Sequence, residues 1–207
     1  VGKLTHSKDN GIKDSIDPEV VMDPESGKVW MFFGSVGGIH RVELTSDGKR
    51  LAEGARFEHI AGLNINMNPS RSRVYEGSYL YKKDGYWYLF ASSGKYFDHT
   101  YGIVVGRSRT LDGIFTDKGG KDMADGHASA ILQSSSKDKF FGPGHNGEII
   151  TDSKGQDYIL YHCHNRVDDK DMGRHTLLQR IYWDKDGWPY FKTGKPLAVE
   201  KMPNTGH

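Results

Sequence analysis

Residues 75–94 read YEGSYLYKKDGYWYLFASSG. Two runs rich in Tyr, Trp, Phe and Leu, at 78–82 and 86–92, lie on either side of Lys83-Asp84-Gly85. Aromatic and apolar runs of this length are typical of strands, and an Asp-Gly pair supplies the backbone geometry of a tight hairpin turn. The stretch therefore predicts a β-hairpin.

The same pattern occurs twice more along the chain. Strand-like pairs separated by turn residues are found at 18–23 with 29–33 and at 147–151 with 157–162. Each of the three pairs is followed by another strand candidate, at 38–44, 101–108 and 176–183. Repeats of three or four strands are typical of propeller blades, and hairpins at this spacing also occur in β-sandwiches. We predict an all-β fold of about three blades, at about 15–70, 71–140 and 141–207, with a polar loop at 117–130.

Composition excludes several classes of protein. The chain has 207 residues, 28 Lys+Arg against 27 Asp+Glu and a formal net charge of +1, so we expect neither nucleic acid nor an anionic membrane as a partner. No apolar run approaches the roughly 18 residues that a membrane span needs. Cys163 is the single cysteine, which excludes an intrachain disulfide. The first residue is Val, and we expect either that a leader was removed or that the chain begins partway through a larger protein.

Three chemically active residues stand where the first strand of each repeat begins. They are Asp17, Glu76 and His145. The first strands of all blades line the central channel of a propeller, so residues at their starts converge on one pocket. Two carboxylates and an imidazole can perform acid–base chemistry, and glycoside hydrolysis needs a carboxyl group on each side of the bond that breaks.

Five stretches, taken in this order, resemble one family of enzymes. They are SIDPEVVMDPESGKVWMFFGS (15–35), YEGSYLYKKDGYWYLFASSG (75–94), YGIVVGRS (101–108), FGPGHNGEIITDSKGQDYILYH (141–162) and QRIYWDKDGWPYF (179–191). The chain resembles glycoside hydrolase family 43, a group of five-bladed β-propellers, and most closely its endo-α-1,5-L-arabinanases. The resemblance implies hydrolysis of α-1,5-linked L-arabinan with inversion. An exo-α-L-arabinofuranosidase or β-xylosidase of the same family, and a catalytically silent glycan-binding propeller, are the alternatives.

The resemblance also implies roles for single residues. Glu76 matches the general acid, and Asp17 matches the carboxylate that modulates the pKa of this acid and helps to position the sugar. His145 matches a histidine near an ion in the central channel, commonly calcium, which it reaches largely through water. We further predict substrate contacts for Ser35 and for Phe97 and Tyr101, whose rings we expect to be exposed, with core or inter-blade packing as the alternative for the two aromatic rings. We expect no organic cofactor.

The general base of the family is an Asp in the first blade, whereas the Ile16-Asp17-Pro18 motif belongs to the third. Two blades, on the order of 120 residues, are therefore expected to be supplied by a companion chain or segment. We assign no base within residues 1–207. Arabinan or a related pentose polysaccharide is the expected substrate, and because polysaccharides do not cross membranes we expect a secreted or periplasmic location.

Overall fold

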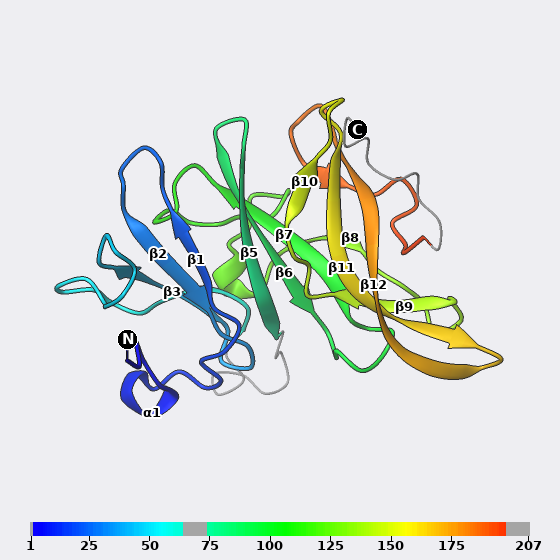
Figure 1. Ribbon diagram of the computed structural model, residues 1–207, viewed down its shortest axis with the longest axis horizontal. Helices are drawn as coiled ribbons and strands as arrows, with labels where there is room; N and C mark the ends of the chain where they lie inside the picture. The colour runs from blue at the N-terminus through cyan, green and yellow to red at the C-terminus, as the bar shows by residue number, and fades with distance from the viewer. Residues whose placement is uncertain (1, 64–73, 198–207) are drawn as a thin grey trace. The chain divides into compact units, whose positions relative to one another are not determined.

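The computed structural model describes residues 2–63 and 74–197, whose strands form three sheets (Figure 1). Parts of the first two predicted repeats, at 64–73, and the end of the third, at 198–207, lie outside the described residues. Among the described residues, no helix is long and apolar enough to cross a membrane.

The first sheet is an antiparallel meander in which each strand pairs with the next along the chain. Its strands are β1 (Glu19–Met22), β2 (Val29–Phe33), β3 (Ile39–Leu44) and β4 (Glu58–Ala61). The β3–β4 pairing places His40 opposite His59. The predicted strands at 18–23, 29–33 and 38–44 are confirmed to within one residue at either end.

The second sheet contains the hairpin with which the sequence argument began. Its strands follow the order β5 (Tyr75–Lys83), β6 (Tyr86–Ser93), β7 (Gly102–Ser108) and β8 (Ser129–Leu132). Asp84 and Gly85, between β5 and β6, have φ values of +49° and +76°. Two consecutive positive φ values are the requirement of a type I′ hairpin turn, which explains the Asp-Gly pair at this point.

The third sheet differs in that its first strand is interrupted. Its strands are β9 (Phe140–Gly144), β10 (Ile149–Thr151), β11 (Asp157–Val167), β12 (Lys170–Trp183) and β13 (Pro189–Tyr190). Both β9 and β10 pair with β11, β9 near His164 and β10 near Ile159. The break between them carries His145, whose φ is +46°.

The chain divides into two compact units. Unit 1 contains residues up to 90 together with 106–128, and unit 2 contains 91–105 together with the residues from 129 onward. The strands β6 and β7 therefore contribute to both units. Each contact of the candidate site lies within a single unit.

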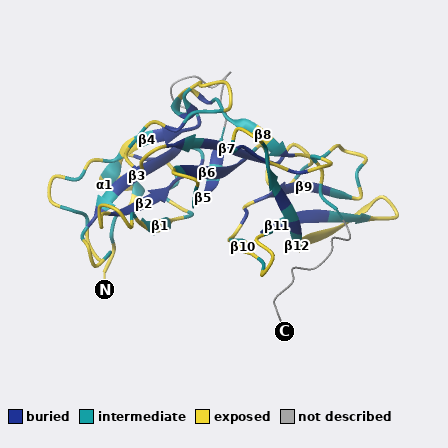
Figure 2. Cartoon of the chain, turned by 90° about the horizontal axis from the view of Figure 1, so that it is seen from above, coloured by how far each residue is buried: buried dark blue, intermediate teal, exposed yellow. Residues whose placement is uncertain are grey.

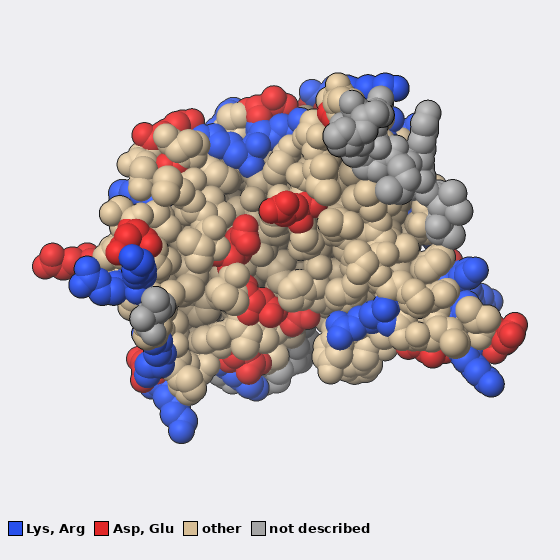
Figure 3. All heavy atoms as spheres, in the orientation of Figure 1, with Lys and Arg blue, Asp and Glu red and all other residues tan. Residues whose placement is uncertain are grey.

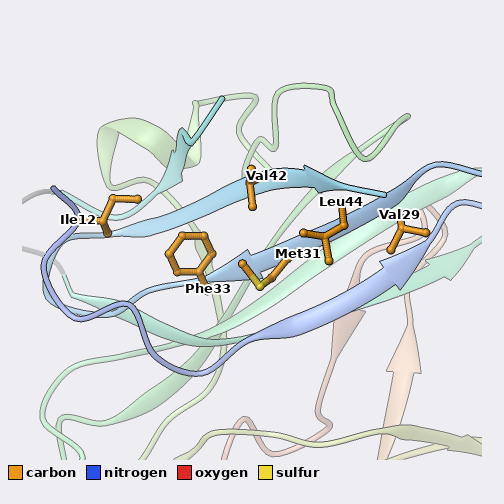
Figure 4. Close-up of a cluster of buried hydrophobic side chains, with 6 residues drawn as sticks. All are labelled: Ile12, Val29, Met31, Phe33, Val42 and Leu44. Carbon is orange, nitrogen blue, oxygen red and sulfur yellow. The ribbon is translucent and has the colours of Figure 1, made fainter. Parts of the chain in front are cut away.

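A hydrophobic cluster supports the first sheet in unit 1. Figure 4 shows its side chains pointing toward one another from β2, β3 and the segment before β1: Ile12, Val29, Met31, Phe33, Val42 and Leu44. The strands β2 and β3 are almost wholly buried, whereas the turn at 24–28 between β1 and β2 is exposed (Figure 2). This pattern follows from the aromatic and branched apolar residues of the strands, since removing apolar surface from water is the main favourable term in folding.

Short elements were not predicted. They are the helix α1 (Ser7–Asn10), the strand β4 and the 3₁₀ helix η2 (Met123–Asp125). The prediction of a loop at 117–130 is wrong at its end, because η2 and the first residues of β8 lie inside this range. Elements of three or four residues carry too few positions to show a hydrophobic period.

Candidate active site

Glu76 is the second residue of β5 and has a close polar partner in unit 1. The Ser35 hydroxyl donates a hydrogen bond of 2.6 Å to Glu76 Oε2. Ser35 is 4% exposed and Glu76 is half-buried. The structure thus brings together two of the residues singled out from the sequence, 41 positions apart, where β2 ends and β5 begins.

A glycine-rich turn fixes the position of Ser35. Gly34 has a φ of +126°, and a Cβ at this position would lie 2.1 Å from the carbonyl oxygen of Gly38. Only glycine accepts both this backbone conformation and this close approach. The Gly38 N–H donates back to the Ser35 carbonyl at 2.8 Å, closing the turn. The turn therefore fixes the backbone position from which the Ser35 side chain projects.

Asp17 precedes β1 and also belongs to unit 1. Its φ is +54°, which is uncommon for a residue other than glycine and is disfavoured before a proline such as Pro18. The Gly34 N–H donates a hydrogen bond of 2.9 Å to the Ile16 carbonyl, which joins the segment carrying Asp17 to the turn carrying Ser35. The pKa-modulating role of Asp17 stays a prediction.

His145 lies in unit 2, in the break between β9 and β10, and is exposed. Its backbone N–H donates to Ser92 Oγ at 2.6 Å, and its ring centroid is 6.2 Å from that of His162. Ser92 is fully buried and fixes the His145 backbone at its unusual φ. Sequence reasoning missed Ser92, because a serine inside an aromatic strand gives no signal of its partner.

The described residues do not form a direct calcium site around His145. Nowhere in 2–63 and 74–197 do three or more His, Cys, Asp or Glu side chains gather in a way that could hold a metal ion. Calcium takes six to eight oxygen ligands, which a single imidazole cannot replace. These residues fit only an ion held mainly by water, with His145 beside it.

The predicted aromatic contacts differ in exposure. Phe97 is 58% exposed and lies next to Tyr96, with ring centroids 5.2 Å apart in an edge-to-face arrangement. Tyr101 is 1% exposed and stacks on His162, with ring centroids 6.0 Å apart. The expectation that Tyr101 is exposed is wrong, and the alternative of core packing describes this ring. Phe97 is more than half exposed, with Lys95 Nζ 6.0 Å from its ring centroid, and its contact with substrate stays a prediction.

Comparisons with known proteins identify the family. The model of a family described as glycosyl hydrolases family 43 matches residues 2–189. An extracellular exo-α-(1→5)-L-arabinofuranosidase of Cellvibrio japonicus is 35% identical over 184 residues, which cover 85% of this chain and 51% of that protein. An extracellular endo-α-(1→5)-L-arabinanase of Bacillus subtilis is 29% identical over 194 residues, covering 92% of this chain and 54% of that protein.

Solved structures agree with the sequence relatives. An α-L-arabinanase of Cellvibrio cellulosa superposes with a TM-score of 0.71 at 34% identity, covering 84% of this chain and 56% of that chain. The same enzyme has been solved in complex with arabinohexaose, with 33% identity to this chain. The chain spans about half the length of the curated relatives it matches.

The three sheets, together with the likeness to solved arabinanases, define an all-β chain of the five-bladed propeller class, of which these residues supply a part. The predicted fold class is thereby confirmed. More narrowly, the chain belongs to glycosyl hydrolases family 43, and the family predicted from the sequence is confirmed as well.

Proposed function

We propose that the protein hydrolyses α-1,5-linked L-arabinan with inversion at the anomeric carbon, and that Glu76 is the general acid. The part-buried hydrogen bond from Ser35 to Glu76, in a chain that belongs to family 43, is the observation that supports this proposal. Relatives named for arabinan and for α-(1→5)-linked arabinofuranose support the substrate.

In the proposed reaction Glu76 gives its proton to the glycosidic oxygen while the bond from that oxygen to the anomeric carbon breaks. A water molecule attacks the opposite face of the sugar and loses its proton to a general base. We propose that Asp17 positions the sugar and tunes the acid, and that Phe97 offers an exposed ring for a further sugar unit. The base is proposed to lie outside residues 1–207, in the part of the relatives that this chain does not match.

Substitution of Glu76 tests the proposal. Glu76→Gln keeps the shape of the side chain but carries no proton to transfer, so kcat on debranched arabinan should fall by about 10²- to 10⁴-fold in the full-length protein. Glu25→Gln is the matched control, because Glu25 is an exposed carboxylate whose side chain forms an ion pair with Lys82 at 2.6 Å. Release of reducing sugar is the measurement.

Turnover that survives Glu76→Gln would remove Glu76 as the acid. A wild-type protein that binds arabinan in isothermal titration calorimetry without cleaving it would favour a glycan-binding propeller.

Exo action is a second candidate, because the relative at 35% identity is named an exo-α-(1→5)-L-arabinofuranosidase. An endo enzyme releases a ladder of oligosaccharides early in the reaction, whereas an exo enzyme releases products of one size from the first turnover. The chain length of early products, measured by anion-exchange chromatography, separates the two.

Two accompanying features are part of the same proposal. We propose that an ion held mainly by water lies beside His145, supported by the exposure of this imidazole and its fixed backbone. Metal analysis of the purified protein and of a His145→Ala variant tests it. We also propose that the protein acts outside the cytoplasm, in line with relatives named extracellular.

A further inference from the structure

We propose that Ser35 is a positioning residue for the general acid: its hydroxyl holds Glu76 and stabilises the carboxylate that remains after the proton has left. The inference rests on the proposed function of Glu76 and assigns Ser35 a role in proton transfer rather than in contact with the substrate.

The geometry of the hydrogen bond supports this role. The distance of 2.6 Å from Ser35 Oγ to Glu76 Oε2 lies at the short end of the range for O–H···O bonds. Ser35 is 4% exposed, so water competes little for either partner and the interaction is stronger than it would be in solvent.

The turn that carries Ser35 leaves the hydroxyl little freedom. Cβ atoms at Gly34 and Gly37 would lie 2.1 Å from Gly38 O and 2.8 Å from Lys13 O, so larger residues do not fit on either side of the turn. Gly34 is also bonded to Ile16 O. A donor held in place before the reaction costs no reorganisation when charge develops on its partner.

A hydroxyl that donates to a carboxyl group favours the ionised form, because the charged oxygen is the better acceptor. Ser35 is therefore placed to stabilise the carboxylate of Glu76 once the proton has left. During the reaction the O–H bond of Glu76 breaks, the proton moves to the glycosidic oxygen, and the charge left on the carboxylate is stabilised by Ser35. The effect of Ser35 on the rate is largest for substrates with a strongly basic leaving group, because departure of such a group depends most on its protonation.

Two measurements on the full-length protein test the inference. Ser35→Ala and Ser35→Gly both remove the hydroxyl, and the glycine variant also suits the tight turn if alanine disturbs it. In both variants the alkaline limb of the pH profile of kcat/KM should shift to higher pH by about one pH unit, because the acid keeps its proton to higher pH. On aryl arabinobiosides, kcat/KM should fall about tenfold more with a phenolate than with a dinitrophenolate leaving group.

Two further variants serve as controls. Ser35→Thr keeps the hydroxyl and should keep the alkaline limb in its wild-type position even if its extra methyl group lowers the rate. Ser108→Ala removes a serine of comparable burial, 7% exposed, from β7 in the same unit and should change neither measurement.

An unchanged alkaline limb and equal losses on both leaving groups in Ser35→Ala and Ser35→Gly would overturn the inference. A limb that moves equally in Ser35→Thr would also overturn it, because the effect would then come from the turn rather than from the hydroxyl. Failure of the wild-type protein to cleave any arabinoside would instead refute the proposed function, so the two failures are distinguishable.

Discussion

His40 shows how strongly one residue depends on its surroundings. The side chain is 8% exposed, its Nδ1 lies 3.1 Å from the Gly38 carbonyl, and its ring centroid is 5.2 Å from that of His59. Burial, and then repulsion from His59, lower the pKa of His40 to about 4. Burial also lowers the pKa of His59. Both rings are therefore neutral at pH 7, and the neutral Nδ1–H of His40 can donate to the carbonyl.

The free energy of unfolding should fall as the pH is lowered from about 6.5 to about 4. In this window the unfolded chain binds a proton at His40 that the folded protein does not bind, so protonation favours unfolding. A loss on the order of 3 kcal/mol is expected from this site. Urea denaturation across the window measures it.

His40→Asn provides the comparison, because the Asn amide can donate to Gly38 O but does not titrate. Its decline in stability with falling pH should be shallower than that of the wild type. Parallel pH curves for the two proteins would contradict the assignment of this effect to His40.

At the scale of elements, Arg41 joins β3 to a distant turn of unit 1. Its guanidinium donates to three backbone carbonyls, of Leu111 at 2.9 Å, Asp112 at 2.6 Å and Gly113 at 2.6 Å, and pairs with Glu58 at 2.8 Å. The residue is 7% exposed. The planar fork of arginine is what allows one side chain to satisfy several acceptors at once.

Arg41→Met should destabilise the protein by about 3 kcal/mol, because the carbonyls of the 111–113 turn lose a charged donor in a poorly hydrated place. Arg41→Lys should recover only part of this loss, since an ammonium group cannot reproduce the fork. Urea denaturation followed by tryptophan fluorescence measures both variants. Lys49→Met, at a side chain that is 66% exposed, is the control, and an effect as large as that of Arg41→Met would contradict the argument.

Elements with a repeated pattern could be predicted from the sequence, and those fixed by tertiary contacts could not. The hairpin of β5 and β6 follows from its aromatic runs and the Asp84-Gly85 turn, which are local features. The short strand β4 and the break between β9 and β10 depend on pairing with β3 and β11, which no local pattern specifies. For the site, Glu76 was found from its motif, whereas its bond to Ser35 and the burial of Tyr101 required the folded chain.

For the molecule as a whole, charge is balanced. The formal net charge is +1, and both signs occur over the strands of unit 1 on the face seen in Figure 3. A nearly neutral protein exerts little long-range attraction or repulsion on a ligand. Arabinan, the proposed substrate, carries no charge on its arabinose units, so its binding would have no Coulombic component to screen.

The KM for debranched arabinan should therefore change by less than about twofold between 0.05 and 0.5 M NaCl, although the Debye length shrinks severalfold over this range. Initial rates at both salt concentrations measure it, with the unfolding midpoint recorded under the same conditions. A KM that rises steeply with salt would contradict the expectation that arabinan binding has no Coulombic component.

Unit 1 is built from two separate stretches of the sequence, which affects the order in which its parts are synthesised on the ribosome. Residues up to 90 pack with 106–128, so the segment 91–105 is synthesised before unit 1 has all its parts. Arg41 leaves the ribosome 70 residues ahead of Leu111, whose carbonyl accepts its hydrogen bond. Synthesis of these 70 residues takes roughly 4 to 14 s at bacterial and eukaryotic translation speeds. During that interval the nascent chain carries a guanidinium whose three carbonyl acceptors have not yet been made, although Glu58 follows only 17 residues after Arg41. All four strands of the first sheet are therefore synthesised before the turn to which Arg41 joins them.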